Sequence, residues 1–431
     1  MKIIHTSDWH LGRYLNKMKK RYDEFEAFLD WLAETVDRRE AEALIVAGDV
    51  FDNTTPTHKA QELYYDFLRR ILVRSQCCRH AVIVGGNHDS PSFLEAPSNL
   101  LRGLGAHVIG AKAWDNPLRE VLPLRDREGR LELIVCAAPF LRESDLRLAE
   151  MGDGADERHQ KIVLGLGEHY RELAEEAQRL IAENGRPVPV VATGHLFFKG
   201  SSASDDDGVR DIHAGPLSAL PLDVLPHFDY LALGHLHTAQ CVGKRETARY
   251  SGSPIPMGFN EAAQTKSVCL VDFGAPGQTL AAPTGQALAV PTGQALAAPT
   301  VELIPVPSFR TLKRLEGDVP TLLGKLKALK GQAAWVELVH TGPELEGDYR
   351  HLLDEAVEGT GLEILSVKDV GRRALTMSIE DEAVPLGEMS LADVFDRLLK
   401  DREVPEDQWP ALREAHARLV GEMETEDVLA E

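Results

Sequence analysis

Five short segments of the chain share one design, in which a run of apolar residues typical of a β-strand leads through a small residue into Asp, Asn or His. They are residues 3–10 (IIHTSDWH), 44–49 (LIVAGD), 82–89 (VIVGGNHD), 190–195 (VVATGH) and 231–237 (LALGHLH). In open α/β sheets, ligands gather outside the carboxyl ends of the strands. Glycine lets the backbone turn sharply and approach a site closely. We therefore expect the five strand ends to bring their polar side chains into one crevice.

The pattern between these segments predicts an α/β layer fold for the first 270 or so residues. The strands expected from apolar runs are Lys2–His5, Ala43–Ala47, Ala81–Val84, His107–Ile109, Leu131–Ala137, Val188–Thr193 and Tyr230–Leu233. Apolar residues at helical spacing predict helices over Asp23–Asp37 and Thr57–Val73. Strands and helices thus alternate, at least in the first part of the chain.

The polar side chains at the strand ends form a set of hard and borderline metal ligands. The predicted ligands are Asp8, His10, Asp49, Asn87, His195, His235 and His237. Seven donors are too many for one ion with an open position, so we expect two divalent ions with Asp49 between them. Such a pair activates water and stabilises phosphorus during in-line displacement. Mixed His and carboxylate ligation without Cys favours Mn²⁺, with Fe²⁺ or Zn²⁺ also allowed.

Two further residues are predicted to act beside the metals. His88 directly follows Asn87, and we expect it to hold the phosphate and protonate the leaving oxygen. Asp52 is expected to orient that imidazole. Any one of these histidines could instead be a hydrogen-bonded structural residue. The occurrence of all five motifs in one chain argues for the metal site.

A low-complexity segment follows the strand-rich region. Residues 277–300 are three copies of an eight-residue unit, GQTLAAPT, GQALAVPT and GQALAAPT. The spaced Pro and Gly prevent a continuous helix. Ser267–Phe273 and Val301–Val306 on either side resemble paired strands, so residues 274–300 are interpreted as a mobile hairpin loop. Binding of a ligand specific for the repeat is the alternative.

Residues 301–380 are predicted to form a small second domain. Its expected helices are Pro320–Leu329 and Asp348–Thr360, and its expected strands are Ala334–His340, Leu362–Val367 and Ala374–Ile379. In residues 381–431, a helix with Ser390 at its N-cap and a second amphipathic stretch are expected. Their apolar residues are Leu391, Val394, Phe395, Leu398, Leu399, Trp409, Leu412 and Leu419. These faces either cover the preceding domain or dock a partner helix.

Composition limits the class of protein only loosely. The net charge is −21, and residues 381–431 contribute 15 acidic and 5 basic residues, so nearly half of the excess lies in the tail. The acidity therefore argues only mildly against a DNA-binding face. Five cysteines without a CxxC pair fit a reducing cytoplasm. We expect neither a signal peptide nor a membrane span.

The motifs DxH, GDxxD, GNHD, GH and GHxH resemble those of the calcineurin-like metallophosphoesterase superfamily. The phrases around them are similar to those of the SbcD family, the nuclease subunits of bacterial SbcCD complexes. These phrases are HTSDWHLGR at 5–13, AGDVFDN at 47–53, GGNHDSP at 85–91, DYLALGHLHTAQ at 229–240, YSGSPIPMGFNEA at 250–262 and KSVCLVDF at 266–273.

The resemblance implies a fold and a site. It implies an αββα sandwich of two β-sheets flanked by helices over residues 1–273, followed by a small α/β capping domain over 301–380. It also implies the same seven metal ligands, with His88 as the histidine that acts on the transition state. Asp52 would support this histidine, although some nucleases of the group have His at that position.

The resemblance further implies a substrate and partners. The substrate would be DNA, cut by an exonuclease activity at duplex ends and an endonuclease activity on single strands and hairpins, in double-strand-break repair. An SbcC-like ATPase with a long coiled coil would dock on the helices after Ser390, since the chain has no GxxxxGK[ST] motif of its own. A homodimer would form through Thr57–Val73 and Pro91–Leu104.

A basic cluster follows the first motif. The cluster comprises Arg13, Lys17, Lys19, Lys20 and Arg21, which either contact DNA phosphates or form a solvated helix start.

Two other functions compete with the nuclease. A small-molecule phosphodiesterase or nucleotidase would use the same metal site but has no need of a cap and an acidic tail. A non-catalytic scaffold would have lost a ligand, and all seven are present.

Overall fold

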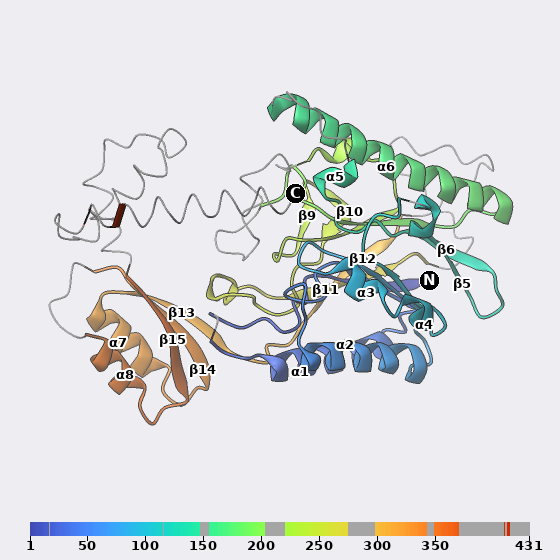
Figure 1. Ribbon diagram of the computed structural model, residues 1–431. Helices are drawn as coiled ribbons and strands as arrows, with labels where there is room; N and C mark the ends of the chain where they lie inside the picture. The colour runs from blue at the N-terminus through green and yellow to red at the C-terminus, as the bar shows by residue number, and fades with distance from the viewer. Residues whose placement is uncertain are drawn as a thin grey trace. The chain divides into compact units, whose positions relative to one another are not determined.

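The computed structural model describes residues 1–16, 18–114, 116–146, 155–202, 220–274, 298–342 and 349–369, together with residues 409, 412 and 413. The chain divides into two compact units. The first comprises Met1–Val339 and Asp348–Lys368 and contains nearly all of the described helices and strands (Figure 1). The second comprises His340–Gly347 and Asp369–Glu431, most of which lies outside the described residues.

The first sheet has six strands in the order β12-β11-β1-β2-β3-β4. Its four parallel strands are β1 (Lys2–Thr6), β2 (Ala43–Ala47), β3 (His80–Val84) and β4 (Ala106–Ile109). Two antiparallel strands, β11 (Ser267–Asp272) and β12 (Thr300–Pro305), complete one edge and pair from Ser267–Pro305 to Asp272–Thr300. The predicted pairing on either side of the repeat is therefore confirmed.

The second sheet also has six strands, in the order β5-β6-β7-β8-β10-β9. Its strands are β5 (Val121–Arg125), β6 (Leu131–Cys136), β7 (Val190–His195), β8 (Tyr230–Gly234), β9 (Gln240–Val242) and β10 (Arg245–Tyr250). The central four, β6, β7, β8 and β10, run parallel. Parallel order places the carboxyl ends of β7 and β8 at one edge of the sheet.

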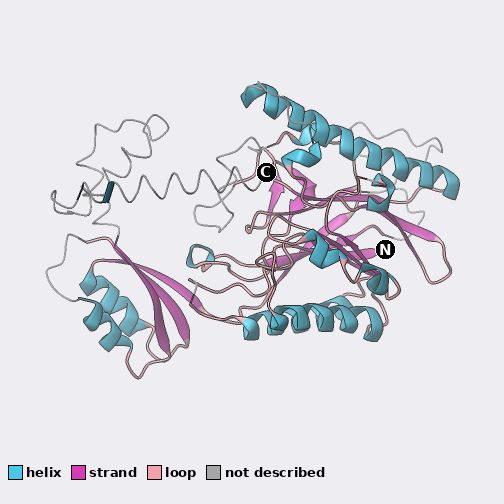
Figure 2. Ribbon diagram, in the orientation of Figure 1, coloured by secondary structure: helices cyan, strands magenta, loops and turns pink. Residues whose placement is uncertain are grey.

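The two sheets pack face to face, with helices on both outer faces (Figure 2). Alternate residues of the central strands, such as Ile45 and Val135, fill the layer between the sheets. The residues between them face outward, where Leu44 and Val46 contact the core under α1 (Tyr22–Arg38) and α2 (His58–Arg69). On the other sheet the long helix α6 (Ala155–Asn184) covers the outer face. Burial on both faces explains the continuous apolar runs, and the predicted αββα sandwich is confirmed.

Short elements complete the sandwich. They are α3 (Pro91–Glu95), α4 (Ser98–Arg102), α5 (Glu143–Leu146), the 3₁₀ turns η2 (Pro117–Glu120), η4 (Leu222–Val224) and η5 (Phe259–Glu261), and the π-helical turn η1 (Arg70–Arg74). The segment η1 continues α2 toward Val73, so the predicted helix over Thr57–Val73 is present with a change of winding. The Thr57 side chain caps α2 by accepting a hydrogen bond from the Ala60 N–H.

A three-stranded sheet lies in the C-terminal part of the chain, in the order β13-β14-β15. Its elements are β13 (Leu312–Gly317), α7 (Val319–Ala328), β14 (Ala334–His340), α8 (Tyr349–Val357) and β15 (Leu362–Asp369). Leu322 and Leu326 of α7 pack with Val336 and Leu338 of β14 in a core of their own. This is the small α/β unit expected there, with β13 as a strand that was not predicted.

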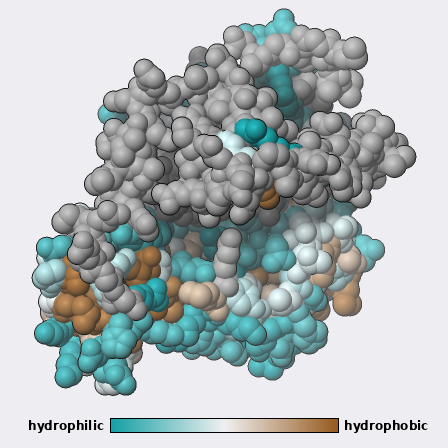
Figure 3. All heavy atoms as spheres, turned by 60° about the vertical axis from the view of Figure 1, so that its left-hand side comes forward, coloured by the Kyte–Doolittle hydropathy of each residue, from teal (hydrophilic) through white to brown (hydrophobic). Residues whose placement is uncertain are grey.

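Several predicted features lie outside the described residues. They are the octapeptide repeat, the strand Ala374–Ile379, and the helix beginning at Ser390 with Leu391, Val394, Phe395 and Leu398. Trp409 and Leu412 are described and half-buried. No described helix combines the length and the apolar character needed to cross a membrane. On the face seen in Figure 3, the described surface is largely hydrophilic, with hydrophobic residues in separate patches.

Candidate metal centre

The ends of five strands meet at one place in the sandwich. Asp8 and His10 follow β1, Asp49 follows β2, and Asn87 follows β3, while His195 ends β7 and His235 and His237 follow β8. The six Asp and His side chains of this set are buried. Three overlapping groups, Asp8–His10–His237, Asp8–Asp49–His195 and His10–Asp52–His88, each bring candidate ligand atoms within 4.8 Å of one another. The structure therefore brings together the residues that the five motifs predict.

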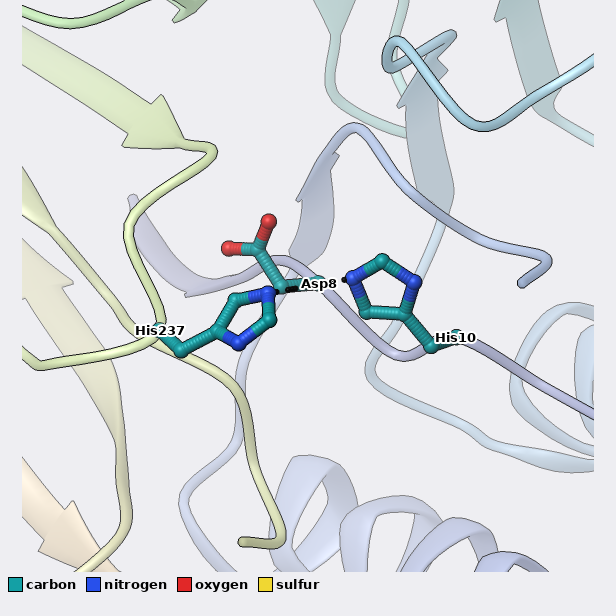
Figure 4. A group of neighbouring side chains, drawn as sticks. All are labelled: Asp8, His10 and His237. Atoms are coloured by element: carbon teal, nitrogen blue, oxygen red, sulfur yellow. Dashed lines mark hydrogen bonds between the residues drawn. The ribbon is translucent and has the colours of Figure 1, made fainter. Parts of the chain in front are cut away.

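One half of the centre is formed by Asp8, His10 and His237 (Figure 4). The Nε2 atoms of His10 and His237 face each other at 3.2 Å. Burial lowers the pKa of His10 to about 4, against the opposing effect of the Asp52 and Asp49 carboxylates. Two imidazole nitrogens and a carboxylate that converge in a buried site form a donor set that fits a divalent cation.

Asp49 lies between this half and the next. Its Oδ2 is 3.5 Å from His10 Nε2 and 3.3 Å from His195 Nε2. Burial raises the pKa of a carboxyl group, but the neighbouring His195, His10 and His88 outweigh it and hold the pKa of Asp49 well below its usual range. The carboxylate is therefore ionised and reaches donors on both sides, as a bridging ligand must.

The second half is built around Asn87. Its Oδ1 lies 3.0 Å from His195 Nε2 and 3.1 Å from His235 Nδ1. Burial, together with the charge of His195, lowers the pKa of His235 to about 3. For His195, burial acts to lower the pKa, but Asp49 and Asp8 outweigh it and raise the pKa to about 9. All seven predicted ligands are thus within one connected cluster.

The backbone at this cluster adopts a rare conformation. Asp8, His10, Asp49 and His235 have φ angles of 53°, 47°, 52° and 98°. Left-handed backbone costs a non-glycine residue of the order of 1 kcal/mol. Hydrogen bonds between the first two loops hold it in place, from Asp8 N–H to Gly48 O (3.0 Å) and from His10 N–H to Asp49 O (3.0 Å). Strain of this kind, concentrated on candidate ligands, is typical of functional sites.

The glycines of the motifs make room for these ligands. A methyl group built on Gly48 would lie 2.2 Å from His195 Nδ1, and one on Gly86 would lie 2.1 Å from Asp49 Oδ1. On Gly234 it would lie 1.9 Å from the Ala47 carbonyl oxygen. No larger side chain fits at these three positions unless the site moves.

His88 lies beside His10, with their ring centroids 4.8 Å apart. Its Nδ1 is 2.9 Å from the main-chain carbonyl oxygen of Asp52. The Asp52 carboxylate was expected to make this contact, but it lies 3.5 Å from His10 Nδ1 and 3.5 Å from Arg13. Burial raises the pKa of Asp52, and the hydrogen bond and charge of His10 reverse this and lower it.

Two groups around the ligands were not identified from the sequence. Asp89 accepts hydrogen bonds from the N–H groups of Val50 (3.1 Å), Phe51 (2.9 Å) and Gly86 (2.9 Å), and so ties the second and third motifs together. Burial and the charge of Asp49 raise the pKa of Asp89 to about 7. Its place in the GNHD motif was a usable signal. Glu261, 3.3 Å from His237 Nδ1, lies outside the five motifs but within the phrase YSGSPIPMGFNEA at 250–262, which was a usable signal.

The basic cluster does not form one exposed surface. Arg21 is only 1% exposed, pairs with Glu24 at 2.7 Å and donates to the Pro256 carbonyl at 2.7 Å. The prediction that Arg21 contacts DNA is therefore wrong, because its guanidinium is part of the interior. Lys19 pairs with Glu363, Lys20 is exposed, and Lys17 lies outside the described residues.

Comparison with known proteins gives matches over both parts of the chain. The model of the calcineurin-like phosphoesterase family matches residues 1–239. The model described as the type 5 capsule protein repressor C-terminal domain matches residues 308–403. The SbcD subunit of nuclease SbcCD from Escherichia coli (strain K12) is 34% identical over 417 residues, which is 96% of each chain.

Two further relatives carry the same name. The protein of Rhodobacter capsulatus is 38% identical over 278 residues, covering 63% of this chain and 66% of its own. The protein of Bacillus subtilis (strain 168) is 34% identical over 282 residues, covering 64% and 67%.

Proposed function

The chain belongs to the SbcD family of calcineurin-like phosphoesterases, and on that premise we propose that its buried donor cluster holds two divalent metal ions for the hydrolysis of DNA phosphodiesters. As a member of this family it is a metal-dependent nuclease. The observation that carries the assignment of the site is the convergence of seven donors from five strand ends in one buried cluster.

The donors divide between two ions. We assign Asp8, His10 and His237 to one ion, Asn87, His195 and His235 to the other, and Asp49 to both. When bound, the two ions polarise the attacking water and neutralise charge at the phosphate. The oxygen and imidazole donors favour Mn²⁺, with Fe²⁺ or Zn²⁺ as alternatives. The low pKa of His10 and of His235 keeps both rings neutral and able to donate a lone pair.

His88 is proposed to act on the substrate itself. A carbonyl oxygen can only accept, so the Nδ1 atom that faces the Asp52 carbonyl carries a proton. The atom left for the substrate is Nε2. In this proposal His88 enters the step as an imidazolium with a proton on each nitrogen; Nε2–H donates to a phosphate oxygen and passes its proton to the leaving oxygen of the DNA strand, which leaves a neutral ring with its proton on Nδ1.

The substrate and partners follow from the family. We propose exonuclease action on duplex ends and endonuclease action on single strands and hairpins, within an SbcCD-like repair complex. The nuclease domain would be residues 1–273 together with β12, which pairs with β11 in the first sheet, so the capping domain would be only the part of 301–380 that follows β12. The acidic tail 381–431 would be the site for a coiled-coil ATPase. We further propose a homodimer through α2 and α3–α4, action in the cytoplasm, and phosphate contacts from Arg13 and Lys20.

The test compares cleavage with metal binding in one variant. Purified protein with Mn²⁺ should degrade linear duplex and hairpin DNA. His88→Ala should lower cleavage by about 10²–10⁴-fold and still bind two ions per chain, measured by metal analysis after gel filtration. His351→Ala, on the exposed side of α8, is the control. Cleavage of a mononucleotide analogue but not of DNA, with the ATPase partner present, would instead identify a small-molecule phosphodiesterase.

A further inference from the structure

A buried group of polar side chains lies directly behind His237, on the side of the ring that faces away from His10. Its members are Glu261 at the end of η5, Lys266 just before β11, and Ser253 in the segment between β10 and η5. Glu261 and Ser253 are fully buried, and Lys266 is 6% exposed. Charged groups are rarely buried this deeply unless they are paired.

We propose that Glu261, held in place by Lys266, is a positioning residue that keeps the proton of His237 on Nδ1 and so leaves Nε2 free for a metal ion. The inference rests on the proposed function, because it assigns His237 to a metal site. It adds a residue outside the five motifs to the machinery of that site.

The hydrogen bonds of Glu261 fix the orientation of its carboxylate. Its Oε2 receives hydrogen bonds from the Lys266 ammonium, from Ser253 Oγ (3.2 Å) and from the Met257 N–H (3.1 Å). Its Oε1 lies 3.3 Å from His237 Nδ1. A carboxylate ionised by its ammonium partner can only accept, so His237 Nδ1 must be the donor. The lone pair of His237 is then on Nε2, the atom 3.2 Å from His10 Nε2.

Lys266 hydrogen-bonds to both residues of the Glu261–His237 contact. Its ammonium group donates to Glu261, to Ser253 Oγ (3.0 Å) and to the main-chain carbonyl of His237 (3.0 Å). The Lys266 carbonyl in turn accepts the Val306 N–H at 2.8 Å. The carboxylate and the backbone of the histidine it orients are therefore tied to one cation.

The turn that carries Glu261 is anchored on its other side. Phe259, two residues earlier, is buried in a cluster with Leu312 of β13 and Trp335 of β14. A supporting residue placed on a rigid turn holds a ligand in a narrower range of orientations than one on a free loop.

His237 differs in this respect from two other histidines of the site. His195 Nδ1 faces the Ala47 carbonyl and His88 Nδ1 faces the Asp52 carbonyl, both of the main chain. His237 instead donates to a charged side chain, which makes the ring a stronger base toward metal. A side chain can be substituted without rebuilding the loop, so the role can be tested directly.

Glu261→Gln separates the proposed role from simple packing. With Lys266 present, the amide oxygen of Gln turns to the ammonium and its NH₂ turns to His237. The histidine then accepts at Nδ1 and carries its proton on Nε2, where it blocks the metal. We expect Mn²⁺ binding at the site that contains His237 to weaken by about 10–100-fold, with binding at the other site unaffected. Calorimetric titration of the full chain measures both.

A second substitution should partly reverse this effect. In Glu261→Gln with Lys266→Met, the charged donor that orients the amide oxygen is gone and only Ser253 Oγ and the Met257 N–H remain on that side, so Mn²⁺ affinity should return part of the way toward the wild-type value. Glu175→Gln, at an exposed position of α6, is the matched control and should bind as wild type does. If Glu261→Gln weakens Mn²⁺ binding equally at both sites, and the double variant shows no recovery, the proposal is overturned in favour of a purely structural role.

One measurement needs no folded variant of Glu261. In the metal-free wild-type protein, the ¹⁵N shifts of the His237 ring, assigned with His237→Gln, should show a proton on Nδ1. A proton on Nε2 would overturn the proposal. Failure of the wild-type protein to bind two ions would contradict the proposed function itself, whereas wild-type metal binding by Glu261→Gln contradicts only the role of Glu261.

Discussion

The Nδ1 atom of His88 lies 2.9 Å from the main-chain carbonyl oxygen of Asp52, while the Asp52 carboxylate points to His10 and Arg13, at 3.5 Å from each. The backbone of Asp52 therefore sets the tautomer of one histidine, and its side chain lies beside a different histidine. The two contacts can be separated by substitution.

Asp52→Asn should weaken metal binding more than it slows catalysis. The substitution leaves the main-chain carbonyl beside His88 in place and removes a negative charge next to His10. We expect the apparent Mn²⁺ affinity to fall about 10-fold, with cleavage recovering to near the wild-type rate at saturating Mn²⁺. The measurement is the DNA cleavage rate as a function of Mn²⁺ concentration. A saturated rate as low as that of His88→Ala would show that the carboxylate itself serves His88.

Gly86→Ala should disrupt the site by steric conflict alone. The φ angle of Gly86 is not positive, but a methyl group would lie 2.1 Å from Asp49 Oδ1 and 2.3 Å from Asp49 N. We expect loss of Mn²⁺ binding and a fall of about 1–3 kcal/mol in the free energy of unfolding.

Gly324→Ala provides the control for this prediction. No heavy atom lies within 4 Å of a methyl group at Gly324, which is inside α7. It should raise the free energy of unfolding by about 0.5–1 kcal/mol and leave metal binding unchanged. Urea unfolding and metal analysis test both variants, and normal metal binding by Gly86→Ala would refute the steric argument.

Arg21→Ala should destabilise the fold and leave the phosphate contacts of the surface intact. It removes the partner of the buried Glu24 carboxylate, and breaking a buried ion pair costs about 3–5 kcal/mol. Lys20→Ala, at an exposed position, should change stability by less than about 0.5 kcal/mol.

DNA binding should show the reverse pattern: the Lys20 substitution should weaken it and the Arg21 substitution should not. If Lys20 contacts a phosphate, Lys20→Ala should reduce the slope of log affinity against log salt by about one. The measurement uses catalytically inactive protein at several salt concentrations. Unchanged stability together with weaker DNA binding in Arg21→Ala would restore the original prediction for that residue.

His107→Gln should make stability less sensitive to acid. Burial, together with the charges of His80 and Arg102, lowers the pKa of His107 to about 4 in the folded chain, against about 6.5 when unfolded. Between these values the unfolded chain binds a proton that the folded chain does not, so stability is complete above pH 6.5 and falls as the pH drops toward 4.

The expected difference is measurable with metal-free protein. Between pH 7.5 and pH 5, the loss of unfolding free energy in His107→Gln should be smaller than in wild type by up to about 2 kcal/mol. Urea unfolding in EDTA measures it, with His351→Gln on α8 as the matched control. An identical loss in His107→Gln and wild type would show that His107 does not contribute to acid sensitivity.

The strands of the sandwich were predictable where both faces are buried. Ala43–Ala47 of β2 is a continuous apolar run, and all five of its residues are buried. The strand β10 begins with exposed Arg245 and Glu246, and β5 carries Pro123, so neither gives such a run. In α6, Gly165 lowers the helical propensity of the sequence. Only the structure gives a reason for it, because a methyl group there would lie 1.9 Å from the Leu146 carbonyl oxygen.

The sequence by itself determined the α/β layer fold of the core, the chemistry of the donors and their place after strand ends, because apolar pattern and residue type are local properties of the chain. The tertiary structure decided which atom of each donor is available. The His235 N–H donates to Asp8 Oδ1 at 2.9 Å across 227 residues of sequence, and His237 meets Glu261 only after β8 and η5 have folded together. Tautomers, left-handed backbone and the burial of Arg21 depend on such long-range contacts, which residue spacing does not encode.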